Sequence, residues 1–371
     1  MRILHVINSL DPSGAERHLV NLFEPLKALG VENHLVTFFP GNGFEEQVRR
    51  YVSRAELAVG RARAFQATVR MAREVDVVHT QLTYADILGR AAAAVARTPS
   101  VTTIQTSAWA PENRHVIALD PLRYHTYRIS DALTSRLAMR FFAVSAKAAR
   151  AYTEGFDVPH DRMEVIANTV DLRAFDPSKG PSREEARAAL GFAPGEFAVV
   201  TLARLIALKA LPEAVRAVSI ASKRHPVRMV IAGEGVERAN IQAQIDALGA
   251  PVTLVGRRDA VSVLKAADLF VLPSYMEGMP VSLIEAMAMG VPCLCSDIPE
   301  NTECGGDAAV YSPVRDPERF AEAMAALIED PARREELSKR SVERARRYSA
   351  DAVAERFLRG IERALEARRL A

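Results

Sequence analysis

The chain has 371 residues, 49% of them hydrophobic and 25% charged, which is typical of a globular protein with two or three domains. Its formal net charge of +2 is too close to neutral for nucleic acid to be the expected partner. An odd number of cysteines, with no C-x-x-C pair, disfavours a disulfide framework and a zinc site and fits a reducing cytoplasm. No apolar run spans a bilayer, and the first one is too short for a signal peptide.

Short aliphatic runs alternate with longer helical patterns along the chain, which is typical of parallel sheets covered by helices. In the first half, we predict strands at residues 3–7, 33–38, 75–79, 101–104, 141–144 and 164–166. Residues 171–182 lose this periodicity and gather proline, glycine and serine, which predicts a linker.

A second alternating series follows the linker, with predicted strands at residues 197–202, 228–232, 252–254, 268–272, 292–296 and 308–311. The charged tail, 331–371, carries an apolar helical stripe made of Val353, Phe357, Leu358, Ile361 and Leu365. We therefore predict an α/β protein with two doubly wound, Rossmann-like domains, at residues 1–176 and 183–347. A C-terminal helix, 348–371, is expected to pack back on the first domain.

Two carboxylates flank a predicted strand-to-helix junction in the second domain. Glu277 follows the strand at 268–272. Glu285 lies in a helix that we expect to have Pro280 in its first turn, to continue from Ser282 to Met289 and to end at Gly290. In open α/β sheets, ligands bind at this edge. The helix N-terminus can hold a phosphate while the carboxylates accept bonds from hydroxyl groups. This combination describes a nucleotide sugar, and the alternative is two solvated glutamates.

Cations and glycines follow neighbouring strands at the same edge. Arg204 and Lys209 come after strand 197–202 and suggest a diphosphate clamp, although two such cations in isolation are more often solvated. Gly233 and Gly256 end strands and would let a base or ribose approach the backbone. Because position 238 is an arginine, Gly233-Glu234-Gly235 does not complete a dinucleotide fingerprint. No D-x-D pair is present to anchor a metal beneath a diphosphate.

The first domain offers weaker signals. Gly14 lies in the loop Ser13-Gly14-Ala15-Glu16 after the first strand, where small residues would let the first helix approach a diphosphate or an acceptor. The alternative is a plain loop with an N-cap serine. His5 and His79 also lie near strand ends, where histidines are more often buried structural residues than catalytic ones.

These motifs resemble those of the retaining glycosyltransferases of the GT-B fold, in glycosyltransferase family four (glycosyl transferases group 1). The likeness runs over nearly the whole chain and is most specific in the second domain. It is carried by the E-x7-E signature from Glu277 to Glu285 with Gly278 and Pro280, the pair Arg204 and Lys209, the element Asn168-Thr169-Val170-Asp171, and the loop containing Gly14.

The resemblance implies two Rossmann-like domains that face each other across a cleft. It implies metal-independent transfer of a sugar from a nucleoside-diphosphate sugar to an acceptor hydroxyl, with retention of configuration and no cofactor. Glu277 would contact the transferred sugar and Glu285 the ribose, while Gly256 would line the base pocket. The donor-binding set would be Gly14, Arg204, Lys209, Gly233, Gly256, Gly278, Met279, Pro280, Val281, Ser282, Leu283 and Glu285.

The chain departs from the family pattern at three positions. Ala203 and Ala210 replace glycines beside the arginine and the lysine, and Gln105 stands after strand 101–104 where many relatives carry a histidine. A glutamine can hydrogen-bond a hydroxyl or the leaving oxygen, but it cannot titrate. Gln105 is thus a candidate for positioning the substrate. Two alternative functions stay open, a UDP-sugar epimerase of the GT-B fold and a non-catalytic subunit that binds nucleotide sugars.

The acceptor cannot be identified from the sequence, and we consider a saccharide or a lipid-linked molecule. A basic zone in the first domain is either a solvated helix face or a patch that meets anionic lipid. Its short apolar face favours the first interpretation. The zone comprises Arg49, Arg50, Arg54, Arg61, Arg63, Arg70 and Arg73. We therefore expect a cytoplasmic protein with at most weak peripheral contact at the inner membrane face.

Overall fold

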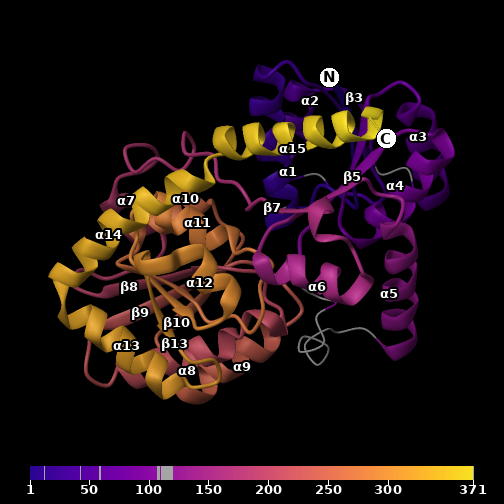
Figure 1. Ribbon diagram of the computed structural model, residues 1–371. Helices are drawn as coiled ribbons and strands as arrows, with labels where there is room; N and C mark the ends of the chain where they lie inside the picture. The colour runs from indigo at the N-terminus through magenta and orange to yellow at the C-terminus, as the bar shows by residue number, and fades with distance from the viewer. Residues whose placement is uncertain (12, 42, 58–59, 107–108, 110–119, 371) are drawn as a thin grey trace. The chain divides into compact units, whose positions relative to one another are not determined.

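A computed structural model describes residues 1–11, 13–41, 43–57, 60–106, 109 and 120–370 (Figure 1). The chain forms two compact units. Unit 1 comprises Met1–Thr169 together with Ala350–Ala371, and unit 2 comprises Val170–Ser349. Among the described residues, no helix combines the length and the hydropathy that crossing a bilayer requires.

Unit 1 is built on a seven-stranded parallel sheet with the strand order β3-β2-β1-β4-β5-β6-β7. The strands are β1 (Arg2–Ile7), β2 (Glu32–Thr37), β3 (Val52–Glu56), β4 (Val77–Gln81), β5 (Ser100–Ile104), β6 (Arg140–Ala143) and β7 (Met163–Val165). The helices are α1 (Gly14–Ala28), α2 (Glu45–Tyr51), α3 (Arg61–Ala72), α4 (Thr83–Ala96), α5 (Pro121–Ser135), α6 (Ala146–Phe156) and α15 (Ala350–Leu370).

Six of these seven strands lie within one or two residues of their predicted positions, and β3 was missed. The central strands β1 and β4 are buried, and each contains an aliphatic run. β4 ends on the buried polar residues His79, Thr80 and Gln81, so its end was predicted two residues early. The edge strand β3 alternates between half-buried and exposed positions and carries Arg54 and Glu56. Charged residues protect an exposed sheet edge, and they also remove the apolar signal by which a strand is recognised.

The helix α15 belongs to unit 1, where it packs on α1. Val353, Phe357 and Ile361 from its apolar stripe are buried in a core cluster with Leu22 and Leu26 of α1. The tail is thus two helices in different units, because α14 (Pro331–Ala345) belongs to unit 2.

The first unit gives way to the second at Thr169 and Val170, earlier than the predicted boundary at residue 176. Val170 forms an isolated parallel bridge with Ser349, and its N–H group donates to the carbonyl of Tyr348 at 2.8 Å. These bonds tie the start of unit 2 to its own end.

Unit 2 contains a six-stranded parallel sheet with the order β10-β9-β8-β11-β12-β13. Its strands are β8 (Phe197–Leu202), β9 (Val227–Ala232), β10 (Val252–Gly256), β11 (Leu269–Leu272), β12 (Cys293–Ser296) and β13 (Ala309–Ser312). Its helices, besides α14, are α7 (Arg183–Ala189), α8 (Leu211–Ala221), α9 (Arg238–Leu248), α10 (Ala260–Ala266), α11 (Val281–Ala288), α12 (Pro299–Gly305) and α13 (Pro317–Glu329). The three cysteines are buried in β12 and α12.

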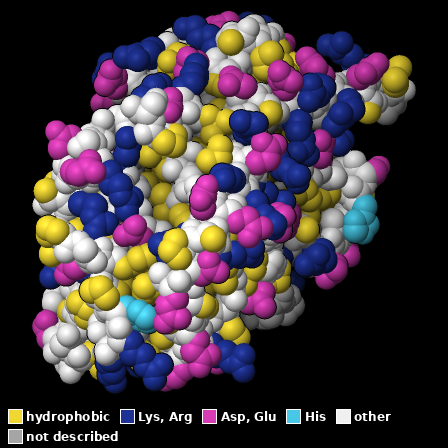
Figure 2. Space-filling model, turned by 90° about the vertical axis from the view of Figure 1, so that its left-hand side faces the viewer, with side chains coloured by type: hydrophobic (Ala, Val, Ile, Leu, Met, Phe, Trp, Pro, Cys, Tyr) yellow, Lys and Arg dark blue, Asp and Glu magenta, His cyan; other side chains and the backbone are white. Residues whose placement is uncertain are grey.

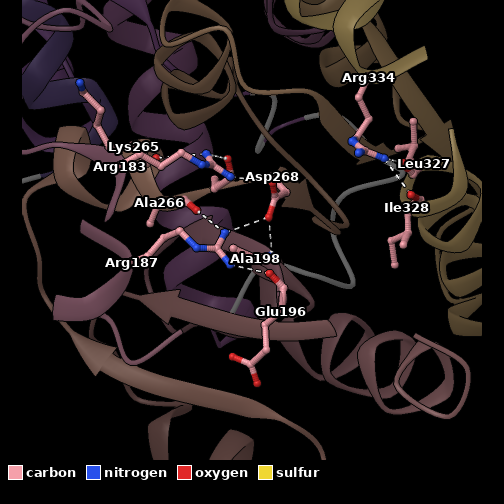
Figure 3. A network of polar contacts seen from close by, with 11 residues as sticks. Arg183, Arg187, Glu196, Ala198, Lys265, Ala266, Asp268, Leu327, Ile328 and Arg334 are labelled. Atoms are coloured by element: carbon pink, nitrogen blue, oxygen red, sulfur yellow. Dashed lines mark hydrogen bonds and ion pairs between the residues drawn. The ribbon is translucent and has the colours of Figure 1, made fainter. Parts of the chain in front are cut away.

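Asp268 fastens α7 to the start of the central strands (Figure 3). Its carboxylate accepts bonds from Arg183 at 2.6 Å and from Arg187 at 3.0 Å, both on α7. It also accepts the N–H group of Ala198 in β8 at 2.8 Å. The strand that we predicted from residue 268 therefore begins at Leu269, and Asp268 holds a helix in place.

The basic zone of unit 1 is not a single helix face, which corrects that part of the sequence interpretation. Its arginines lie on α2, β3 and α3, and at the end of α3. Several are paired with carboxylates, as in Arg50 with Glu46 at 2.9 Å and Arg54 with Glu74 at 3.0 Å. Arg61 stacks over the ring of Tyr84 instead. This pairing neutralises much of the charge that an anionic lipid would need.

The two histidines near strand ends are core residues. His5 of β1 and His79 of β4 are register partners, and their Nδ1 atoms lie 2.9 Å apart. His5 also contacts Asn33 through Nε2 at 3.2 Å, and His79 contacts Thr103 at 2.8 Å. Burial lowers the pKa of His5 to about 4 and that of His18, in α1, to about 3, and it holds the pKa of His79 well below its usual value.

These buried histidines predict a stability that falls in mild acid. The unfolded chain binds protons at them below pH 6.5, whereas the folded protein resists protonation until about pH 4. The three histidines therefore contribute about 1.4 kcal/mol each that is present at pH 7.5 and lost at pH 5.5. Asp86 offsets part of this loss, because burial raises its pKa to about 7 and the folded protein binds its proton over the same range. Urea unfolding at the two pH values should show a net loss, and His79→Gln should reduce that loss by about 1.4 kcal/mol.

The exposed His160 offers a matched control for that experiment. His160→Gln should leave the difference in unfolding free energy between pH 7.5 and pH 5.5 unchanged. A wild-type protein that is equally stable at both pH values would contradict the assignment of these histidines as neutral core residues.

Candidate functional site

The strand order of unit 2 reverses between β8 and β11, which pair with each other in parallel. Successive strands after β8 run to one side through β9 and β10, whereas β12 and β13 lie on the other side of β11. The loops that leave the carboxyl ends of β8 and β11 therefore diverge, and such a switch point is where doubly wound sheets bind ligands. These two loops carry Arg204, Lys209 and Glu277.

An ion pair joins the two loops. The Nζ atom of Lys209 donates to both carboxylate oxygens of Glu277, at 2.6 and 2.8 Å. Glu277 is only 7% exposed, so this cation is its neutralising partner in a largely desolvated position. Lys209 ends a short 3-10 turn, Ala207–Lys209, and Ala210 follows it with a φ of 47°. The alanine thus adopts the left-handed conformation that the glycine of the family pattern would adopt without strain.

Tyr275 connects the same loops a second time. Its N–H group donates to the carbonyl of Leu208 at 2.9 Å, and its hydroxyl donates to Glu213 at the start of α8 at 2.9 Å. Burial, followed by the bond to Glu213, raises the pKa of Tyr275, so the hydroxyl keeps its proton. The guanidinium of Arg315 lies over the tyrosine ring, 5.0 Å from its centroid. Tyr275 thereby fixes the spacing between the loop of Lys209 and the loop of Glu277.

Arg204 differs from Lys209 in its surroundings. It is exposed, and it forms no ion pair with a residue that the structure describes. Its loop is anchored on both sides, because Ala203 donates to the carbonyl of Ala232 at 3.1 Å and Leu205 donates to that of Glu234 at 2.9 Å. The structure thus brings Lys209 to Glu277 and leaves the Arg204 guanidinium available to an anion.

The helix α11 starts at Val281 with Pro280 as its N-cap residue, one position outside the first turn in which we predicted the proline. Glu285 is the fifth residue of the helix and is buried, as are Met279 and Leu283. The side chain of Leu283 lies in the core, so it can serve a ligand only through its backbone. Gly278 and Ser282 are half-buried, and together with Met279 they offer backbone groups near the positive end of the helix.

The glycines at the ends of β9 and β10 have a structural reason that the sequence did not reveal. Gly233 donates to the carbonyl of Gly256 at 2.8 Å. A Cβ atom on Gly233 would lie 1.8 Å from the carbonyl oxygen of Ala203, so the protein backbone excludes a side chain there. Gly256 has a φ of 70°, and a Cβ on it would lie 2.9 Å from the carboxylate of Glu234. Glu234 therefore borders the position where we expected a base.

The predicted residues of the first domain lie in unit 1. Gly14 is the exposed first residue of α1, and the preceding Ser13 donates its hydroxyl to Glu16 rather than capping the helix. Gln105 follows β5 and is half-buried, and its Nε2 atom is buried without a hydrogen-bond partner among the described residues. Gly14 and Gln105 thus belong to unit 1, whereas Lys209 and Glu277 belong to unit 2.

A buried polar cluster behind the Glu277 loop was missed. The hydroxyl of Ser296, at the end of β12, donates to the carbonyl of Ser274 at 2.5 Å. Asn301 of α12 donates to both the carbonyl and the hydroxyl of Ser296 at 3.0 Å. These residues buttress the loop from the neighbouring strand. The only sequence signal was a polar stretch after a predicted strand, which is common in loops.

The described side chains contain no group of three or more histidines, cysteines, aspartates and glutamates that could hold a metal ion. Positive charge at this edge of the sheet comes from Arg204, from Lys209, which is paired with Glu277, and from the N-terminus of α11.

The contact between Tyr275 and Glu213 can be tested directly. Tyr275→Phe removes one hydrogen bond, worth about 0.5–1.5 kcal/mol, and should free the loop that carries Glu277. Amide hydrogen exchange in the peptide covering residues 273–280 should therefore become faster, by roughly three- to tenfold. Tyr348→Phe is a matched control, because the hydroxyl of Tyr348 donates to the carbonyl of Cys304 at 2.8 Å, also within unit 2. Equal exchange in Tyr275→Phe and wild type would show that the bond does not restrain the loop.

Two protein families match the chain in consecutive segments. The family described as Glycosyltransferase Family 4 matches residues 12–174, and the family described as Glycosyl transferases group 1 matches residues 182–347. The unmatched residues between them fall in the predicted linker.

Individual relatives agree with this result. The chain is 32% identical to D-inositol 3-phosphate glycosyltransferase of Nocardia farcinica, over 62% of this chain and 53% of the relative. It is 29% identical to the UDP-Gal:alpha-D-GlcNAc-diphosphoundecaprenol alpha-1,3-galactosyltransferase of Escherichia coli, over 61% and 59% of the two chains. The matched region thus spans little more than half the length of these curated relatives.

The fold is shared with the Anabaena protein HepE, crystallised with UDP and glucose. The two structures superpose with a TM-score of 0.85 at 20% sequence identity, over 98% of this chain and 99% of HepE. This likeness confirms the predicted fold class, two parallel α/β sheets of the GT-B type. On the matches to both of its units, the chain belongs to glycosyltransferase family 4, the glycosyl transferases group 1.

Proposed function

We propose that this protein transfers a sugar from a nucleoside-diphosphate sugar to an acceptor hydroxyl and retains the configuration at the anomeric carbon. The observation that carries the proposal is the buried contact between Lys209 and Glu277, at 2.6 and 2.8 Å, at the switch point of the unit 2 sheet. Retention comes from membership of the family and not from a geometry in this chain.

The contact suits the two ends of a sugar diphosphate. A carboxylate held by one cation keeps lone pairs for the hydroxyl groups of a sugar. The same ammonium group, with two of its protons on Glu277, has donor capacity left for a diphosphate oxygen. Arg204 and the backbone near Met279 and Ser282 supply further donors. In this low-dielectric position, such charges can stabilise the negative charge that develops on the leaving diphosphate.

The reaction that we propose needs no divalent metal. The charge on the leaving group would be met by Arg204, Lys209 and the positive end of α11, which occupy the place that a metal takes in other sites for phosphate transfer. Glu285, buried on α11, would accept bonds from the ribose hydroxyls. Gln105 of unit 1 would position the sugar or the acceptor through its amide, without a proton transfer.

For the substrates, we infer a UDP-sugar as donor and a lipid-linked acceptor. The donor inference rests on HepE, which was crystallised with UDP and glucose, and on the UDP-Gal in the name of the Escherichia coli relative. The acceptor inference rests on that relative, whose name specifies a sugar linked to diphosphoundecaprenol.

One alternative has an observation in its favour. Gln105 replaces a titratable residue of the family pattern, which suits a non-catalytic subunit that binds a nucleotide sugar. A donor-hydrolysis assay separates the two functions, because a transferase releases free nucleotide slowly whereas a binding subunit releases none.

The two cations should contribute unequally to nucleotide affinity. Arg204→Ala removes one charge-assisted contact and should weaken UDP binding by about 1.5–3 kcal/mol. Lys209→Ala should weaken it further, because Glu277 then lies buried without its cation and repels the diphosphate. Isothermal titration calorimetry measures both effects, with the exposed Arg224→Ala as a control for the lost charge. Unchanged affinity in both site variants would disprove the diphosphate clamp.

Substitutions at the two glutamates should have different kinetic effects, with Glu277 affecting turnover and Glu285 affecting donor binding. Glu277 would meet the sugar as charge develops at its reacting carbon, so Glu277→Gln should mainly lower kcat, by about 100-fold. Glu285 would hold the ribose equally before and during reaction, so Glu285→Gln should mainly raise the KM for the donor. Steady-state kinetics with a UDP-sugar distinguish the two patterns. Identical kinetic profiles would refute this division, and an inverted product by NMR would refute retention.

A further inference from the structure

The helix α5 in unit 1 is amphipathic, but its polar side faces the interior of the unit and its apolar side faces solvent. Its buried residues are Tyr124, Asp131 and Ser135. Asp131 is fully buried and accepts bonds from Arg90 on α4, from the indole of Trp109 at 2.7 Å and from Tyr152 at 2.5 Å. A helix on a globular protein ordinarily turns its apolar stripe inward. Here a charged hydrogen-bond network holds the inner side, and the apolar stripe faces outward.

The outward stripe of α5 is made of large aliphatic side chains, with the exposed Thr126 between the first and the second of them. Leu122, Ile129 and Leu133 are 77%, 57% and 60% exposed, and their spacing of seven and four residues places them in line along the helix. Leu137 just beyond the helix and Val95 in the last turn of α4 are also exposed. We call these five residues the α5 face. They are half of the ten large hydrophobic residues that are exposed in the described part of the chain.

The charges on α5 and on the end of α4 have one predominant sign. In residues 83–97 and 120–137, Asp120 is the only exposed carboxylate, because Asp86 and Asp131 are buried. Arg97, Arg123 and Arg136 are exposed in the same segments. Arg123 pairs with Asp120 at 3.3 Å, so the excess positive charge comes from Arg97 and Arg136. Arg97 lies near the end of α5, since the hydroxyl of Ser100 just after it reaches the carbonyl of Leu137. The face drawn in Figure 2 is different, with basic and acidic side chains interspersed.

We propose that the α5 face binds the surface of a bilayer that contains anionic lipid. A row of large aliphatic side chains rimmed by arginines, on a helix that lacks an exposed acidic residue, fits an interface of acyl chains and anionic headgroups. A second copy of the chain fits less well. A symmetric dimer brings the same patch of both subunits together, so the arginines would face arginines with almost no carboxylate to pair with them.

This surface replaces the basic zone of α2, β3 and α3 as the membrane-contact candidate, because four of the seven arginines of that zone are paired with carboxylates and its described residues include no comparable row of exposed aliphatic side chains. This proposal extends the proposed function and rests on it, because an enzyme with a lipid-linked acceptor would meet that acceptor at a membrane surface. Binding to lipid itself requires neither donor nor acceptor, so the two proposals can fail separately.

Vesicle co-sedimentation of the full chain tests the proposal. The wild type should bind vesicles of phosphatidylglycerol and phosphatidylcholine, bind pure phosphatidylcholine weakly, and be released by salt. Ile129→Ser with Leu133→Ser should reduce the partition coefficient, obtained from the bound fraction as a function of lipid concentration, at least tenfold. Arg97→Glu with Arg136→Glu should reduce it by roughly fivefold for each arginine lost, or more.

Matched controls come from unit 2. Leu248→Ser removes another exposed aliphatic side chain, at the end of α9, and Lys223→Glu with Arg224→Glu makes the same change of charge outside the α5 face. These variants should bind vesicles as the wild type does. Every variant should retain the wild-type affinity for UDP and the wild-type thermal midpoint, which separates lost lipid binding from misfolding.

Three results would overturn the proposal. The wild type could fail to bind anionic vesicles, or the α5-face variants could bind them as well as the controls do. Sedimentation velocity could instead show a dimer that Ile129→Ser with Leu133→Ser dissociates, which would assign the face to a second copy. Loss of vesicle binding with UDP affinity intact would support the α5 face even if no sugar transfer were found.

Discussion

The parallel pairing of β8 with β11 is the constraint on which the candidate site depends. These strands are neighbours in the sheet although β9 and β10 separate them in the chain, so the loops after them open in opposite directions at one edge. The sheet brings Lys209 and Glu277, 68 positions apart, to 2.6 Å. Asp268 strengthens the opposite end of the same strand pair, where it bonds to Ala198 and to two arginines of α7.

The ion pair makes the chemistry of this edge more specific than a list of charged residues would suggest. Lys209 is not a free surface cation, because burial of Glu277 requires a compensating charge. An arriving diphosphate would therefore meet an ammonium group already oriented by a carboxylate, and the sugar would meet a carboxylate already oriented by an ammonium group. Such preorganisation is what lets fixed charges stabilise a transition state without rearrangement. Tyr275 and Ser296 hold the Glu277 loop from two sides, which supports this interpretation.

The sequence revealed the strands and the charged residues of the site better than it revealed their contacts. Buried parallel strands have a strong aliphatic signal, whereas β3, with its charged edge, has none. Spacing placed Lys209 and Glu277 at one edge, but which of them meet depends on strand order, which periodicity does not specify. Gly233 was interpreted through a ligand, and only the structure shows that the Ala203 carbonyl excludes a side chain. Tyr275 and Asn301 carry no motif, because a single hydrogen bond leaves no pattern in the sequence.

The orientation of α5 also could not be predicted from its sequence pattern, because it depends on the contacts that Asp131 makes. Its apolar residues would ordinarily predict an inward stripe, yet the bonds of Asp131 to Trp109 and Tyr152 direct the opposite side inward. A buried aspartate needs such partners, since an unpaired charge in the core is costly. The outward aliphatic residues contribute little to that core, and exposed patches of this kind mark surfaces that bind something. Stability of unit 1 therefore does not account for Ile129 and Leu133, and contact with a membrane surface does.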